Sequence, residues 1–162
     1  MGKVKKIHAP KLAMHEIYLR GSKNWMSDGF EPTLPGQQLD GKYKVSGDKI
    51  ICRELTLDPD DSLIGSCVFI TNFEFRYFKT INNDKSVSDQ EDPKLVAEVS
   101  AQFAADYLVK GPDTPPEKEF QVWARTAVIL HCWPYWREYC QSSLARMHLP
   151  VAIMPLMLMP PN

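Results

Sequence analysis

The sequence has little of what marks secreted, membrane or nucleic-acid-binding proteins. Its 19 Lys and Arg nearly balance 20 Asp and Glu, giving a formal net charge of -1. A chain this close to neutral has no global field to recruit nucleic acid or anionic lipid. The basic start, residues 1–6, is not followed by the apolar run that a secretory signal needs. We therefore expect no nucleic-acid partner, no membrane insertion and no secretory signal.

The sequence also lacks the common motifs of catalysis and metal binding. No Gly-rich phosphate loop follows a predicted strand, and the four His have no metal-ligand spacing. No C-x-x-C pair is present, so neither a zinc site nor a disulfide framework is indicated. We expect no cofactor, and free thiols in a reducing cytoplasm, at Cys52, Cys67, Cys132 and Cys140.

One pair of residues invites a catalytic interpretation. His131 and Cys132 are adjacent, but neighbours on a helix point in different directions and do not readily form a nucleophile–base pair. We predict that the chain is not an enzyme. A Cys-dependent enzyme or sensor that uses one of these two residues is the alternative from a different class.

Two long segments have the alternation of β-strands. In residues 63–81 and 94–109, apolar and aromatic side chains recur at every second position, which is typical of strands. The polar segment 82–93 connects them, so they are predicted to be antiparallel partners. One face is predicted to carry Cys67, Phe69, Thr71, Phe73, Phe75 and Tyr77 of the first, and Leu95, Ala97, Val99, Ala101, Phe103, Ala105 and Tyr107 of the second.

The first half of the chain has weaker signals. Residues 12–20 fit a strand or a short helix, and their β-branched and aromatic centre favours a strand. Gly and Pro are dense in 21–41, which predicts a loop. Residues 43–52 are predicted to form a hairpin that turns at Gly47–Asp48, because Gly accepts the positive φ of a type II′ turn.

The pattern becomes helical after the Gly- and Pro-rich residues 111–116. Apolar residues then recur at three-to-four spacing, but Pro134 inside a helix would cost about 3 kcal/mol. We therefore predict one helix ending near Cys132 and another beginning near Pro134. Strands followed by helices indicate an α+β fold, and 162 residues fit one domain over 1–162.

The C-terminal segment 149–159 is strongly apolar. It is too short to span a membrane, and Pro150 and Pro155 interrupt it. Burying about six such side chains would contribute on the order of 10 kcal/mol, so something must cover them. Two interpretations stay open: the segment packs on the protein's own core, or it is a surface for partner chains and apolar clients, to which flexible Met side chains adapt well.

The last thirty residues resemble the SecB family of export chaperones. The resemblance lies in an aromatic-Pro-Tyr-x-Arg-Glu start of the main helix at 133–138, a Ser-rich stretch with a basic residue at 142–146, and the apolar-Pro elements Leu149–Pro150 and 153–156. The resemblance implies a four-stranded antiparallel sheet with two C-terminal helices, assembled as a homotetramer that is a dimer of dimers. It also implies an ATP-independent holdase that binds unfolded or precursor proteins in apolar grooves.

The resemblance also implies candidate residues. Val96 and Glu98 align with the family's surface for the SecA motor, although a solvated strand residue is the alternative for Glu98. Candidate client-binding residues are Trp133, Trp136, Met147, Leu149, Val151, Ile153, Met154, Leu156 and Met157.

The pathway has two alternatives. The family's exporters deliver clients to SecA and the Sec translocase for protein export, but they are markedly acidic, whereas this chain is near neutral. The stop soon after Pro155 predicts that the family's final helix and motor-binding tail are missing. A second branch of SecB-like proteins instead protects an antitoxin of a toxin–antitoxin system.

Overall fold

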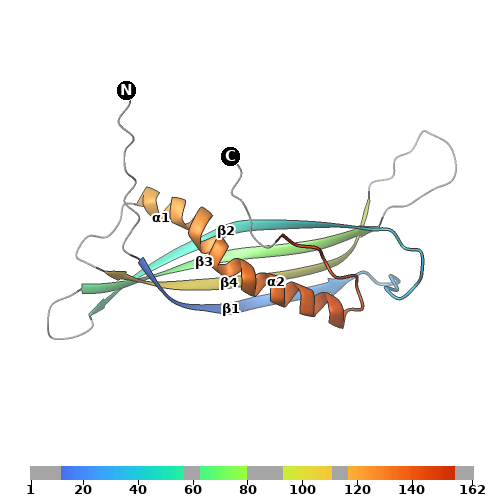
Figure 1. Cartoon of the computed structure of the whole chain (residues 1–162), viewed down its shortest axis with the longest axis horizontal. Helices are drawn as coiled ribbons and strands as arrows, with labels where there is room; N and C mark the ends of the chain where they lie inside the picture. The colour runs from blue at the N-terminus through green and yellow to red at the C-terminus, as the bar shows by residue number, and fades with distance from the viewer. Residues whose placement is uncertain (1–11, 57–62, 80–92, 111–116, 156–162) are drawn as a thin grey trace, which may run out of the picture.

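One antiparallel sheet carries a helical layer on a single face (Figure 1). The computed structural model describes residues 12–56, 63–79, 93–110 and 117–155. The strand order is β1-β4-β3-β2. The elements are β1 (Leu12–Met26), β2 (Leu39–Thr56), β3 (Leu63–Lys79), β4 (Lys94–Lys110), α1 (Glu117–Trp123), the π-helical segment η1 (Ala124–Val128) and α2 (Ile129–Arg146). This confirms the α+β prediction.

The core lies between the two central strands and the helices. The predicted face of β3 is buried from Cys67 to Tyr77, and that of β4 from Ala97 to Tyr107. Helix α2 inserts Trp136 against this face, where its ring stacks on Phe73 at 5.5 Å between centroids. Two strands of alternating side chains therefore supply one wall of the core, as the period-two pattern predicts.

The helix-free face of the sheet changes character along β3. At one end Val68 and Ile70 form a small buried cluster with Ala104. Further along, the same face carries Asn72, then Glu74 and Arg76, which are partly exposed. This face therefore combines an apolar end with a polar end.

The predicted hairpin at Gly47–Asp48 is wrong. β2 is one continuous strand, and it pairs with β3 both before and after this point. Gly47 pairs with Thr71 and Lys49 with Ile70, so Asp48 is the extra residue of a β-bulge. A neighbouring strand that pairs along both arms makes a bulge more favourable here than a turn.

The boundaries of the first strand and of the C-terminal helices also differ from the prediction. β1 continues to Met26, because residues 21–26 pair with β4 in spite of Gly21. Pro134 lies inside α2, and the interruption between α1 and α2 is η1. The large side chains beside Pro134, Trp133 and Trp136, are fully buried, and this burial offsets the cost of the proline. None of the helices that the structure describes is both long and apolar enough to cross a membrane.

Candidate client-binding surface

The chain reverses direction directly after α2. His148 adopts a left-handed conformation with φ 55°. The His148 N–H donates to the Ala145 carbonyl at 3.1 Å, and the Leu149 N–H donates to the Leu144 carbonyl at 3.0 Å. These two bonds are those of a Schellman motif, which closes the end of a helix. The motif sends the following residues back over the sheet (Figure 1); we call 150–155 the return segment.

The side chains of the return segment alternate between core and solvent. Ala152 and Met154 are buried. Val151 is 61% exposed, and Ile153 is fully exposed at 102%. An extended chain places successive side chains on opposite sides, so one side of the segment packs on the core while the other presents apolar groups to solvent.

Two side-chain hydrogen bonds hold the ends of the return segment. The Tyr77 hydroxyl on β3 donates to the Pro150 carbonyl at 2.7 Å. The Trp133 indole N–H on α2 donates to the Pro155 carbonyl at 2.9 Å. The segment therefore spans from the sheet to the helix, and its outward residues are held in place.

Tyr43 on β2 lies beside Trp133, the residue that holds the end of this segment. Its ring centroid is 5.8 Å from that of Trp133, and the residue is 45% exposed. We call Tyr43, Val151 and Ile153 the return-segment surface. Sequence reasoning missed Tyr43, because it lies far from the C-terminal motif and only the packing of β2 near α2 reveals the proximity.

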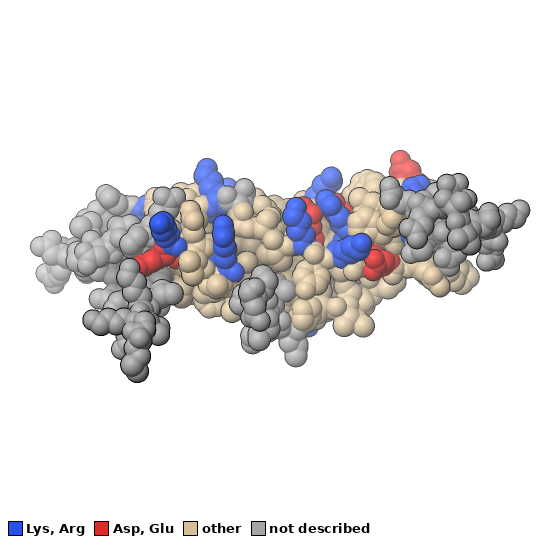
Figure 2. Space-filling view, turned by 90° about the horizontal axis from the view of Figure 1, so that it is seen from above, with Lys and Arg blue, Asp and Glu red and all other residues tan. Residues whose placement is uncertain are grey.

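β2 is an edge strand of the sheet, so one row of its backbone groups has no strand partner within the described sheet. Such an edge can accept an extended peptide as an additional strand. Lys42 and Lys44 are exposed on this strand, and charged side chains discourage non-specific strand pairing. Figure 2, seen from the side where β2 lies uppermost in Figure 1, shows several Lys and Arg side chains between uncharged areas.

The predicted client-binding residues that the structure describes differ in their exposure to solvent in the single chain. Val151 and Ile153 are exposed and can meet a client directly. Four of the predicted residues are buried in the core, so a client could meet them only after the core rearranges. These residues are Trp133, Trp136, Leu149 and Met154. Met147 is partly buried against the core. Leu156 and Met157 lie outside the described residues, as do the predicted connection 82–93 except for its last residue and the Gly- and Pro-rich residues 111–116.

The predicted motor-binding residues lie on β4. Glu98 accepts a hydrogen bond from Arg76 Nε at 2.9 Å, and Arg76 also pairs with Glu74 at 3.2 Å. Val96 is buried in the core, because a register shift between Tyr77 and Phe78 makes it the extra residue of β4. Val96 rather than Leu95 therefore joins the core, and only Glu98 of the two candidates reaches the surface.

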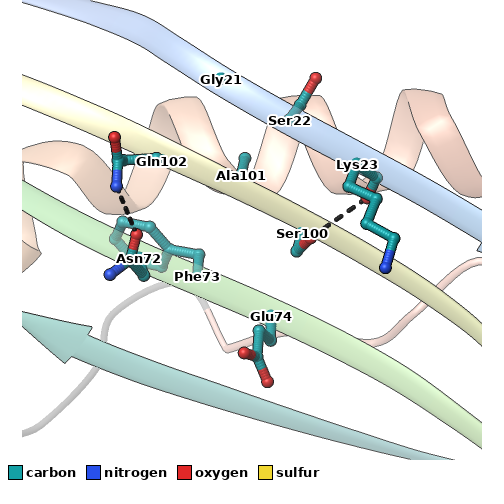
Figure 3. Close-up of a pocket in the computed structure, with 9 residues that line it drawn as sticks. All are labelled: Gly21, Ser22, Lys23, Asn72, Phe73, Glu74, Ser100, Ala101 and Gln102. Atoms are coloured by element: carbon teal, nitrogen blue, oxygen red, sulfur yellow. Dashed lines mark hydrogen bonds between the residues drawn. The ribbon is translucent and has the colours of Figure 1, made fainter.

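The helix-free face carries a shallow depression of about 240 Å³ next to this ion pair (Figure 3). Gln102 donates to Asn72 at 2.9 Å, and the Ser100 hydroxyl donates to the Lys23 carbonyl at 3.2 Å. Its lining residues include neither His nor Cys. The depression therefore holds neither of the residue types on which the Cys-dependent alternative rests.

The catalytic alternative finds little support around Cys132. Burial raises the pKa of the Cys132 thiol to about 12, so the thiol is protonated at neutral pH. His131 Nδ1 lies 2.7 Å from the Tyr107 hydroxyl, which is its hydrogen-bond partner. Among the described residues, no group of three or more His, Cys, Asp or Glu could hold a metal ion.

The comparison with solved structures gives a clear fold match. No protein-family model matches the sequence, and a search of curated proteins finds no match either. The Mycobacterium tuberculosis SecB-like chaperone Rv1957, solved in complex with a ChAD peptide from the Rv1956 HigA1 antitoxin, matches with a TM-score of 0.61. The match covers 93% of each chain at 21% identity. The chain has a SecB-like fold. The SecB-like fold of the single chain that the C-terminal motif predicted is therefore confirmed over nearly the whole chain.

Proposed function

We propose that this protein is a SecB-like molecular chaperone that holds unfolded polypeptides through apolar contacts without ATP or another cofactor. The observation that carries the proposal is the return segment, which is anchored at both ends and directs Val151 and Ile153 outward. Large apolar side chains held in water by a rigid frame are typical of an interaction surface. The peptide-bound structural neighbour supports this proposal.

An antitoxin is the better-supported client class. The structural neighbour was solved with a peptide from an antitoxin, and the near-neutral charge of this chain departs from that of typical SecB exporters. A single dedicated client is also compatible with a small exposed surface rather than a long groove. We therefore propose a dedicated chaperone of a toxin–antitoxin system.

Delivery of precursor proteins to SecA and the Sec translocase is the second candidate. It is supported by the position of Glu98 on the helix-free face, where it pairs with Arg76. The return segment is instead held by Tyr77 and Trp133, on the other face of the sheet. Such a separation would let the motor and a client bind together.

We further propose a cytoplasmic homo-oligomer, assembled as a dimer of dimers. Strand β1 is an edge of the sheet and carries large exposed apolar side chains. A second copy that pairs with this edge would cover these apolar side chains. The side chains are those of Met14, Tyr18, Leu19 and Trp25. A stable monomer at micromolar concentration in light scattering would contradict this assembly.

The holdase proposal is tested by light scattering of a chemically unfolded client mixed with the purified chain. The wild type should suppress aggregation at stoichiometric amounts. The double variant Val151→Asp/Ile153→Asp should lose most of this effect, because a charge on each outward position opposes apolar contact. Leu34→Asp is the matched control, since Leu34 is similarly exposed but lies in the β1–β2 loop. Failure of the wild type to suppress aggregation would refute the holdase.

The competing alternatives separate in binding measurements. A dedicated chaperone should bind its antitoxin peptide with an affinity that the Val151→Asp/Ile153→Asp variant lowers and Glu98→Lys leaves unchanged. SecA binding that Glu98→Lys weakens would instead support export. Cys132→Ser should retain client binding; if it abolished a measurable activity and left client binding intact, the Cys-dependent alternative would be correct.

A further inference from the structure

Two cysteines face each other across neighbouring strands. Cys52 on β2 is the direct register partner of Cys67 on β3. Their sulfur atoms are 2.8 Å apart, and both thiols are free. Opposed residues of an antiparallel pair have Cα atoms about 4.5–5.5 Å apart, which falls within the range that disulfides span. The two thiols therefore need little backbone movement to become bonded.

The two thiols have unequal access to solvent. Cys52 is exposed on the edge strand, whereas Cys67 is buried against the helical layer. Burial, followed by the hydrogen bond to Cys52, raises the pKa of the Cys67 thiol to about 12. A soluble reagent therefore meets Cys52 first, and Cys67 is placed to react second.

We propose that Cys52 and Cys67 form an oxidisable dithiol that closes to a cross-strand disulfide and fixes the edge strand β2 to the centre of the sheet. The oxidant class is a low-molecular-weight disulfide, RSSR.

The reaction proceeds by two exchanges. The Cys52 thiolate attacks one sulfur of RSSR and forms a Cys52–SR mixed disulfide. The RS⁻ that is released takes up the proton that Cys52 lost. Cys67 then loses its proton and attacks the Cys52 sulfur, which breaks the Cys52–SR bond and expels a second RS⁻ that is protonated in turn. Two thiols and one RSSR become one protein disulfide and two RSH, and two electrons pass from the protein to the reagent.

The other two cysteines provide an internal contrast. Cys132 and Cys140 lie on the buried side of α2, and burial raises the pKa of each thiol to about 12. Neither is exposed to a soluble disulfide. Oxidation should therefore be confined to the cross-strand pair. Redox-responsive thiols commonly differ from inert thiols in their exposure to solvent.

The test uses the purified full chain equilibrated with defined ratios of oxidised and reduced glutathione. Alkylation and mass spectrometry should show two of the four free thiols lost together, and peptide mapping should find Cys52 linked to Cys67. Closing this short loop should raise the midpoint of thermal unfolding by about 6–12 °C, and dithiothreitol should reverse the rise.

Two single variants control for the loss of a thiol. Cys52→Ser should keep Cys67 reduced and abolish the thermal shift, whereas Cys132→Ser should still form the crosslink and show the shift. A wild-type product that carries only glutathione on Cys52, or that links Cys52 to another copy of the chain, would overturn the proposal. Peptide mapping of the wild type decides this even where a variant folds poorly.

Discussion

The indole N–H of Trp133 donates to the Pro155 carbonyl, 2.9 Å away across 22 residues of sequence. The neighbouring buried indole, that of Trp136, has no hydrogen-bond acceptor among the described residues. Two tryptophans on the same helix, both fully buried, thus differ in the hydrogen bonding of their indole N–H groups. Trp133 anchors the return segment, whereas Trp136 only fills the core.

This difference gives a matched pair of variants. Trp133→Phe and Trp136→Phe remove the same atoms from the core, but only the first removes a hydrogen bond, which contributes about 0.5–1.5 kcal/mol. Trp133→Phe should therefore be more destabilising by at least about that amount in urea unfolding, because Trp136→Phe also removes a buried donor that has no acceptor among the described residues. It should also speed amide hydrogen exchange in the return segment, and equal exchange in both variants would contradict the anchoring role.

His148 occupies a backbone conformation that suits glycine. Its φ of 55° is the left-handed position of the Schellman motif, where a Cβ is unfavourable. His148→Gly should stabilise the protein by about 0.5–1 kcal/mol in urea unfolding, because the relief of strain exceeds the entropic cost of glycine. His15→Gly, in strand β1 without positive φ, is the control and should be destabilising. A loss of stability in His148→Gly would show that the His side chain itself holds the turn.

Gly41 on β2 is required by its neighbours. A Cβ at this position would lie 2.6 Å from Phe75 Cζ and 3.2 Å from Tyr77 Cε1. Gly41→Ala should therefore cost about 1–3 kcal/mol by overpacking, measured by thermal or urea unfolding. Gly21→Ala is the control, because a Cβ added there would meet no atom within 4 Å. Because Tyr77 also holds Pro150, the Gly41→Ala variant should loosen the return segment as well.

Alkaline pH should destabilise the fold through the buried thiols. Burial raises the pKa of Cys132 and of Cys140 to about 12 from an ordinary value of 9.0. The unfolded chain therefore releases these protons at lower pH than the folded chain, so their contribution to stability is full below about pH 9 and is lost as the pH rises toward 12. Each thiol should contribute a fall of up to about 1.4 kcal/mol per pH unit in this window.

The measurement is urea unfolding at a series of pH values under reducing conditions. The variant Cys132→Ala/Cys140→Ala should be less stable at pH 7 because of the cavities, but its stability should fall less steeply with pH above 9. An unchanged slope would mean that these thiols do not titrate with unfolding.

Local patterns determined much of the fold. The alternation in 63–81 and 94–109 predicted both central strands and their buried faces, because burial on one side of a sheet imposes a period of two on the sequence itself. The change to three-to-four spacing after residue 116 likewise located the helical layer. The ordered motif from Trp133 to Pro155 was enough to indicate the SecB-like arrangement.

The remaining features depended on which segments meet in space. Gly47–Asp48 is a bulge because β3 pairs on both sides of it, and Pro134 is tolerated within α2 because Trp133 and Trp136 are buried beside it. Neither the pairing with β3 nor the burial of the tryptophans can be seen in the local sequence. Local preference alone favours a turn at Gly47–Asp48 and a helix end at Pro134.

The same division applies to the candidate sites. Composition alone showed that the C-terminal segment is apolar and predicted that it is covered, but in the single chain only part of it is. The folded arrangement was needed to show that Met154 points inward and Ile153 outward, and that Cys52 lies opposite Cys67. This is because composition and period are properties of neighbouring residues, whereas burial and strand register are fixed by contacts between residues far apart in the chain.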